Sequence, residues 1–173
     1  MEEEVRRVVK KDPVFGPVHD AEGYISLFPL MLEVIEPNSD QLGIVLKNLN
    51  DTSRMWTSFG LRSVSFSSAY YKKRNTEHDP PYWRGQIWLN MNYLVISSLK
   101  HYAEMGNEKC RHAQLAGELY DQLRKNVVRN VLQQYQKTGY FWEQYDDTKG
   151  TGMGSHPFTG WTSLFVLMMA EHF

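Results

Sequence analysis

The chain has 173 residues, of which 42% are hydrophobic and 13% aromatic, and its 19 basic and 20 acidic residues give a formal net charge of −1. This composition is typical of one globular domain, and the balanced charge disfavours nucleic acid as a partner, so neutral or small ligands fit better. No apolar run approaches the roughly 20 residues of a membrane helix. The single cysteine, Cys110, excludes an internal disulfide and a thiolate metal cage.

The first part of the chain predicts two helices after an irregular edge. Turn-forming proline and glycine pairs in residues 1–22 indicate irregular structure, and the apolar run over residues 26–35 predicts a short buried helix. Ser39 is expected to cap a second, amphipathic helix that ends at Asn50. Asn50-Asp51-Thr52 also matches the N-glycosylation acceptor pattern, which recurs often by chance.

Residues 53–84 have no sustained period and predict a long loop, which at this length is commonly functional. Within it, Arg84 follows Trp83, so a fork of hydrogen-bond donors adjoins an aromatic platform. This pair suits hydroxyl or carboxylate contacts in a pocket. A structural arginine bonded to loop carbonyls is the alternative.

The second half of the chain predicts three more helices. Residues 86–105 are apolar on two faces, with Gly106 as a stop and Asn107 as the cap of the next helix. Apolar residues at every fourth position then predict a long amphipathic helix that Gly139 ends, and Thr159 is expected to cap a last one.

Buried and amphipathic helices therefore alternate, and no convincing strand pattern competes with them. This order predicts an all-α protein in concentric layers, as in an (α/α)6 toroid with long active-site loops between its helices. About five helices are expected here, which is less than half of a twelve-helix toroid.

The segment 139–161, rich in aromatic residues and glycine, predicts an active-site loop. In it, Glu143 lies between Trp142 and Tyr145. Partial burial there is expected to move the carboxyl pKa towards the range useful for proton transfer. The alternative is a surface loop whose aromatic residues fill a core and whose glutamate is solvated.

No motif in the sequence indicates a dinucleotide, calcium or zinc site. The glycines of residues 150–154 do not match the dinucleotide fingerprint, residues 146–150 depart from a calcium loop, and the histidines lack zinc-site spacing. No cofactor and no metal are therefore expected. His78 and His156 lie in the two loops and are candidate substrate contacts.

Several motifs together closely resemble the C-terminal end of the processing α-glucosidase I family, the mannosyl-oligosaccharide glucosidases of glycoside hydrolase family 63. The resemblance covers about residues 23–173, with looser similarity to trehalases. The motifs that carry it are Gly-Tyr-Ile-Ser-Leu-Phe-Pro at 23–29, Gly-Leu-Arg-Ser at 60–63, Glu-His-Asp-Pro-Pro-Tyr-Trp-Arg-Gly at 77–85, Asn-Tyr-Leu at 92–94, Trp-Glu-Gln-Tyr-Asp at 142–146 and Pro-Phe-Thr-Gly-Trp-Thr-Ser-Leu at 157–164.

The resemblance implies an inverting enzyme of the endoplasmic reticulum, anchored to the membrane through its N-terminus, that removes the terminal α-1,2-linked glucose from the N-glycan precursor. By motif, Glu143 is the general base. The acid of the family lies in an upstream Asp-Asp-Tyr-Pro-Arg motif that this sequence lacks, so the isolated chain is expected to be inactive. A catalytically inactive carbohydrate-binding or chaperone-like partner is the alternative.

The resemblance also implies a glucose pocket, for which the residues of the matching motifs are the candidates. Flat aromatic faces would pack on the sugar, and Arg84 would bond hydroxyls or orient Glu143. The expected substrate-binding residues are Trp83, Arg84, Trp142, Tyr145, Trp161, His78 and His156.

Overall fold

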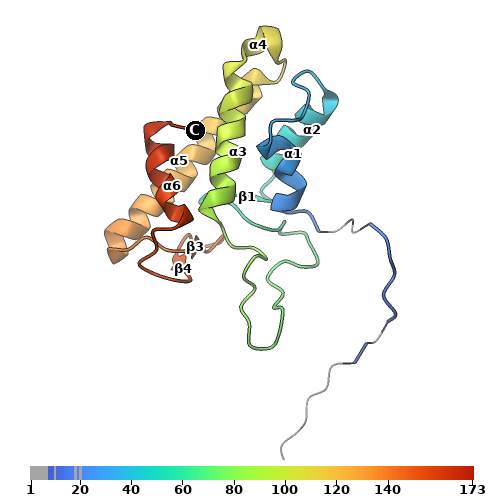
Figure 1. Ribbon diagram of the computed structural model, residues 1–173, viewed down its shortest axis with the longest axis vertical. Helices are drawn as coiled ribbons and strands as arrows, with labels where there is room; N and C mark the ends of the chain where they lie inside the picture. Colours follow the sequence, from blue (N-terminus) through green and yellow to red (C-terminus); the bar gives the residue numbers. More distant parts are fainter. Residues whose placement is uncertain (1–7, 10, 18, 20) are drawn as a thin grey trace, which may run out of the picture.

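Two long helices that lie side by side form the centre of the fold, α3 (Leu89–Glu104) and α5 (Ala113–Thr138). The computed structural model describes residues 8–9, 11–17, 19 and 21–173. A single helical turn, α4 (Gly106–Lys109), connects α3 and α5, and α6 (Leu164–Ala170) packs against both (Figure 1). The described part of the chain is thus rich in packed helices, which is consistent with the predicted all-α class.

The core lies where the apolar faces of these two helices meet. Every fourth residue of α5 from Leu119 to Val131 is buried, and the facing residues of α3 include Ile96 and Leu99, which have no exposed surface. Gly139 ends α5 in the left-handed conformation, with φ of 77°, and its N–H donates to the carbonyl of Tyr135 at 2.7 Å. The predicted long amphipathic helix and its stop are confirmed.

The first predicted helix is shorter than the sequence pattern indicates, whereas the second has its predicted length. The apolar run forms a 3-10 turn, Tyr24–Leu27, and one turn of α-helix, α1 (Phe28–Met31), because Glu33 adopts a left-handed conformation with φ of 58°. The helix α2 (Asp40–Leu49) agrees with prediction: the Ser39 hydroxyl accepts from the Leu42 N–H at 3.2 Å. The described residues up to position 22 lie in no helix or strand, and the rest of the predicted irregular edge, residues 1–7, 10, 18 and 20, falls outside the description.

Two helix caps differ from the prediction. Asn107 lies inside α4 and does not cap α5, which begins after His112. Thr159 does not cap the last helix either, because a 3-10 turn over Trp161–Ser163 comes first and Ser163 precedes α6. In both places a short helical turn precedes the next helix, α4 before α5 and the 3-10 turn before α6.

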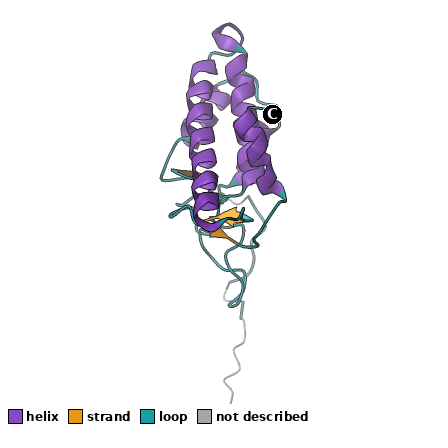
Figure 2. Ribbon diagram, turned by 90° about the vertical axis from the view of Figure 1, so that its left-hand side faces the viewer, coloured by secondary structure: helices purple, strands orange, loops and turns teal. Residues whose placement is uncertain are grey.

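The structure also contains very short strands, which no pattern in the sequence predicts. Within the described residues, four two-residue strands form two antiparallel pairs: β1 (Trp56–Thr57) with β2 (Gly60–Leu61), and β3 (Gln144–Tyr145) with β4 (Gly152–Met153). Figure 2 shows them near one end of the helices, among the loops. No helix in the described part of the chain has the length and apolar character needed to cross a membrane.

Candidate active site

The two loops predicted to be functional meet through backbone pairing. Ile87, three residues after the first predicted loop, exchanges two backbone hydrogen bonds with Tyr145 of β3, with N to O distances of 2.8 and 3.0 Å. On its other side, Ile87 bridges to Arg62, and the neighbouring Ser63 N–H donates to the Gln86 carbonyl at 2.9 Å. Segments far apart in sequence are thereby fixed side by side beneath the start of α3.

Glu143, just before β3, is anchored at its backbone and at both carboxylate oxygens. Its N–H donates to the Ser155 carbonyl at 3.0 Å, and the Ser155 N–H donates back to Oε2 at 3.0 Å. The Tyr82 hydroxyl, from the first loop, donates to Oε1. Only 8% of the residue is exposed, so the carboxylate is held where the two loops meet.

The pKa of Glu143 differs from the sequence-based expectation. Burial raises the pKa of this carboxyl, but the hydrogen bonds from Tyr82 and Ser155 act against burial, and the pKa is lowered from its ordinary value of 4.5. The expected upward shift is therefore wrong, because the sequence does not reveal the donors. The group is ionised at neutral pH, as a proton acceptor must be.

A fully buried indole, Trp88, joins the aromatic residues around this carboxylate. Trp83 stacks on it with ring centroids 3.7 Å apart and planes 5° apart, while Tyr82 meets it edge-on at 4.7 Å. Trp161 packs at 5.6 Å, and its Nε1–H donates to the Glu143 carbonyl at 2.6 Å. Sequence reasoning missed Trp88 and Tyr82, although the proline pair before Tyr82, which restricts the local backbone, was a usable signal.

Trp142 packs on a different side of Glu143. Its indole lies 3.9 Å from the His156 ring, and its Nε1–H donates to the Thr138 hydroxyl at 3.1 Å. Gly152 lies so close that a Cβ there would be 2.1 Å from Cγ of this indole. The hairpin therefore needs glycine at this position to place Trp142 beside His156.

Two of the expected substrate contacts lie elsewhere. Tyr145 is fully buried in the core, and burial raises its pKa to about 12. Its position there argues against a contact with sugar. His78 is exposed in the first loop, where its N–H donates to the Thr76 hydroxyl at 3.3 Å.

Arg84 behaves as the structural alternative anticipated. Its Nη1 group donates to the carbonyls of Lys73 and Arg74 at 3.2 and 3.3 Å, and its guanidinium lies 5.8 Å from the centre of the Tyr70 ring. These bonds direct the Arg84 side chain towards its own loop, and none of them reaches Glu143.

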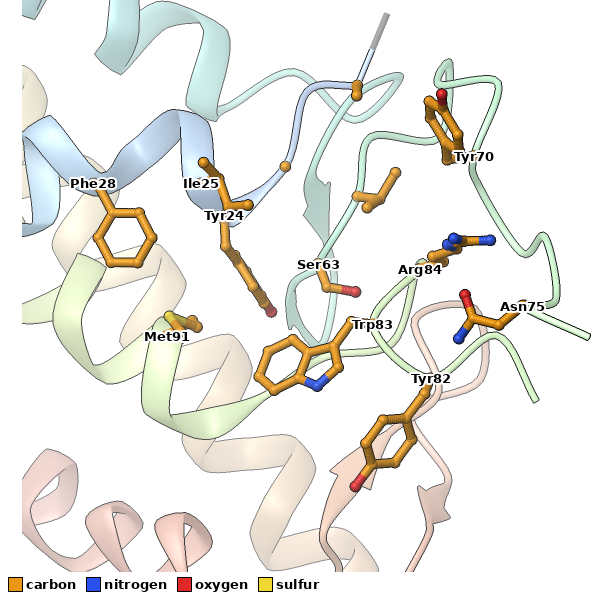
Figure 3. Close-up of a pocket in the computed structure, with 13 residues that line it drawn as sticks. Tyr24, Ile25, Phe28, Ser63, Tyr70, Asn75, Tyr82, Trp83, Arg84 and Met91 are labelled. Atoms are coloured by element: carbon orange, nitrogen blue, oxygen red, sulfur yellow. The ribbon is translucent and has the colours of Figure 1, made fainter. Parts of the chain in front are cut away.

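Trp83 and Arg84 line an open pocket of about 640 Å³, shown in Figure 3. Tyr82 also borders the pocket, but its hydroxyl points away, towards the hairpin of β3 and β4. The predicted sugar-binding residues thus fall into two regions, one around Glu143 and one around this pocket. The pocket is lined by Ala21, Gly23, Tyr24, Ile25, Phe28, Ser63, Val64, Tyr70, Asn75, Tyr82, Trp83, Arg84 and Met91.

A buried ion-pair cluster clamps the two loops together. Asp147, 2% exposed, pairs with Nε of Arg62 at 3.0 Å and with Nζ of Lys72 at 2.7 Å, and it accepts from the Tyr71 hydroxyl at 2.7 Å. Sequence analysis considered this acidic segment only as a calcium loop. Among the described residues no cluster of three or more histidine, cysteine, aspartate or glutamate side chains could hold a metal.

Comparison with known proteins places the chain in a family. The model of the glycosyl hydrolase family 63 C-terminal domain matches residues 1–171. Mannosyl-oligosaccharide glucosidase GCS1 of Arabidopsis thaliana is 46% identical over 151 residues, covering 87% of this chain and 17% of that protein. The probable mannosyl-oligosaccharide glucosidase of Schizosaccharomyces pombe is 42% identical over 152 residues, covering 88% and 18%.

The solved structures that match include a family 63 mannosylglycerate hydrolase from Thermus thermophilus in complex with glucose. Its TM-score is 0.59 at 20% identity, covering 90% of this chain and 31% of that one, a likeness that concerns the fold. The chain spans less than a fifth of the length of the two glucosidases above. With nearly its whole length matched by the C-terminal domain model, the chain belongs to glycosyl hydrolase family 63.

Proposed function

We propose that residues 23–173 are the C-terminal portion of the catalytic domain of an inverting α-glucosidase, with residues 1–22 as an irregular edge, and that Glu143 is its general base. One observation carries the proposal: a carboxylate that is 8% exposed keeps a lowered pKa because donors from two separate loops bind both of its oxygens. A general base has to be ionised before it can take a proton.

In the proposed architecture, α3, α5 and α6 belong to an (α/α)6 toroid whose active-site loops gather at one end. The grouping of both functional loops and all four short strands near one end of the helices supports it. The missing helices and the acid would come from a longer protein that carries this chain.

The proposed reaction inverts the anomeric carbon. Glu143 takes a proton from water as the water oxygen bonds to that carbon, and the glycosidic C–O bond breaks on the opposite face. A carboxylic acid, about 6.5 to 9.5 Å from the base in such enzymes, protonates the departing oxygen. This acid is the aspartate that the family resemblance places in an upstream motif.

The acidic residues after β3 are poor candidates for that acid. Asp147 is committed to ion pairs with Arg62 and Lys72. Burial raises the pKa of Asp146, but hydrogen bonds from Thr148 and Lys149 act against it, and the pKa is lowered. A general acid needs the opposite shift.

The proposed substrate is the terminal α-1,2-linked glucose of the triglucosylated N-glycan precursor. The similarity to mannosyl-oligosaccharide glucosidases from a plant and a yeast supports this choice. Action in the lumen of the endoplasmic reticulum, with a membrane anchor elsewhere in the longer protein, follows from the same resemblance. The chemistry described needs no cofactor.

Among the expected sugar contacts, those near Glu143 are the best supported. Trp142 with His156 forms one aromatic wall, and Trp161 is bonded to the Glu143 carbonyl. Trp83 offers a half-exposed indole on the pocket side. Arg84 and His78 stay secondary candidates.

A second candidate function is binding of carbohydrate without catalysis, by a partner protein that keeps one wall of the sugar pocket. The aromatic pocket around Trp83 favours it, since indole and phenol faces suit the apolar faces of sugars. Calorimetric titration of the 173-residue chain with a glucosylated oligosaccharide separates the two: saturable binding without hydrolysis, even after the upstream segment is added, favours this candidate.

The test of the catalytic proposal is Glu143→Gln in a longer protein that contains this chain and the upstream acid. The amide keeps the shape but cannot take a proton, so kcat for glucose release is expected to fall about 100- to 10,000-fold. Glu118→Gln, an exposed change on α5, is the matched control and should leave the rate unchanged. Near-normal turnover by Glu143→Gln in a folded protein would refute the assignment.

A further inference from the structure

We propose that Tyr82 is the positioning residue for Glu143: its hydroxyl fixes the orientation of the carboxylate and keeps it ionised. This inference rests on the proposed function and extends it to a residue of the other loop, 61 positions away in the sequence. It concerns the hydrogen bond from the Tyr82 hydroxyl to Oε1.

The two donors to Glu143 have different origins and complementary effects. The Ser155 N–H is a backbone group within the same hairpin and binds Oε2. Tyr82 arrives from the first loop and binds Oε1. Because the terminal torsion of a glutamate is broad, a single donor would leave the carboxylate free to swing, whereas two donors on different oxygens fix its plane. Each oxygen keeps a further lone pair that can accept from a water molecule.

The environment of Tyr82 holds its ring in place. The ring meets Trp88 edge-on at 4.7 Å and 86°, and Trp83 edge-on at 6.5 Å and 89°. The Tyr82 N–H donates to the Pro80 carbonyl at 2.8 Å, which closes a tight turn before the ring. A donor whose ring and backbone are both restrained loses little conformational freedom when it binds the carboxylate.

The chemistry of the pair assigns the proton to Tyr82. Its hydrogen bond to Glu143, together with burial, raises the pKa of Tyr82 to about 12, so at neutral pH the phenol donates and the carboxylate accepts. Among the described residues, the groups that lower the pKa of Glu143 by hydrogen bonding are the Tyr82 hydroxyl and the backbone and side chain of Ser155. The pH dependence of Glu143 ionisation is therefore expected to follow from the hydrogen bond between Tyr82 and Glu143.

Gly154 packs closely against the Glu143 side chain, on the side of the Oε2 atom. A Cβ at this glycine, whose φ is +75°, would lie 2.6 Å from Oε2 and 3.1 Å from the Cβ of Glu143. A side chain at position 154 would therefore displace the Glu143 carboxylate, and glycine here leaves it in place for Tyr82 to bind.

The first experiment uses the 173-residue chain and needs no activity. The ¹³C-carboxyl resonance of Glu143, assigned by its loss in Glu143→Gln, is titrated in the wild type, in Tyr82→Phe and in Tyr135→Phe. Tyr82→Phe keeps the ring but removes the donor, so the pKa of Glu143 should rise. Tyr135→Phe is a matched control on α5, where the ring stacks on Phe141, and should leave this pKa unchanged. An unchanged pKa in folded Tyr82→Phe would overturn the inference.

A second measurement covers the case in which Tyr82→Phe does not fold. In the wild-type chain the ¹³Cζ resonance of Tyr82 should titrate well above the ordinary tyrosine pKa, and Glu143→Gln should move that titration back towards pH 10. A Tyr82 titration that is ordinary in the wild type, or that does not respond to Glu143→Gln, contradicts the contact.

Kinetics in a longer, active protein then separate this inference from the proposed function. Tyr82→Phe is expected to lower kcat about ten- to hundredfold at optimal pH, with little change in KM, and to move the acid limb of the pH profile upward. If Glu143→Gln abolishes hydrolysis while Tyr82→Phe alters neither kcat nor the acid limb, the inference fails and the function stands. If Glu143→Gln does not impair hydrolysis, the proposed function fails, while the titrations still report on the contact itself.

Discussion

The surroundings of Glu143 and the pocket beside Trp83 lie on two sides of Tyr82, and they are built differently. Around Glu143, the Ser155 N–H and the Tyr82 phenol bind a buried carboxylate, and glycines at positions 152 and 154 leave room for close packing. The pocket is open, five of its thirteen lining residues are aromatic, and Arg84 there is bonded to its own loop. The first region has the fixed polar groups that chemistry requires, whereas the second offers a surface for recognition.

The largest expected effect comes from breaking the clamp that holds the two regions together. Asp147→Ala leaves the side chain of Arg62, which is 9% exposed, without its buried partner, so the free energy of unfolding should fall by about 3–5 kcal/mol. Urea unfolding followed by far-UV circular dichroism measures this. Asp121→Ala, an exposed change on α5, is the control, and a loss no larger than in the control would contradict the clamp.

A smaller effect is expected from Gly152→Ala, which acts on the Glu143 side. The added methyl group would overlap the Trp142 indole, so it should cost about 1–3 kcal/mol of unfolding free energy and displace Trp142 from His156. Urea unfolding and tryptophan fluorescence report the two changes.

Gly117→Ala in α5 is the matched control, because its Cβ would meet the nearest atom, in Ala103, at an ordinary 3.6 Å. It should stabilise the chain by up to about 1 kcal/mol. Destabilisation of equal size in both variants would show that the contact with Trp142 is not the cause.

Trp83→Ala tests whether the pocket can be altered without changing the surroundings of Glu143. Loss of the stack on Trp88 should lower the free energy of unfolding by about 1 kcal/mol and weaken any sugar binding in the pocket. The pKa of Glu143, titrated by carboxyl NMR, should stay unchanged, because Tyr82 is retained. A shift as large as in Tyr82→Phe would mean that the two regions are not independent.

Local rules in the sequence predict the helical frame well. Ser39 as a cap, Gly139 as a stop and the four-residue repeat of α5 are all confirmed, since each depends on neighbours within one or two turns. The four strands were missed because two residues are too few to show a period. The helix predicted over residues 26–35 was too long, because nothing in the sequence indicates that Glu33 adopts a left-handed conformation.

Of the candidate site, the sequence predicts the important carboxylate and the two loops, but not the contacts between them. The bonds of Tyr82 to Glu143 and of Arg62 to Asp147 join residues 61 and 85 positions apart, beyond the range of any local pattern. For Tyr145 the sequence could not distinguish the two places, because an aromatic residue near a carboxylate can belong equally to a pocket wall or to the core. The fully buried ring belongs to the core.

The most direct test of Glu143 as the base is chemical rescue of Glu143→Ala in a longer protein that carries this chain and the acid. Azide is a nucleophile that needs no deprotonation, so it can replace the activated water. We predict that azide restores substrate cleavage and yields the β-glucosyl azide, with the new C–N bond on the face opposite the departing sugar. Undiminished water-dependent glucose release by Glu143→Ala without azide would contradict the account.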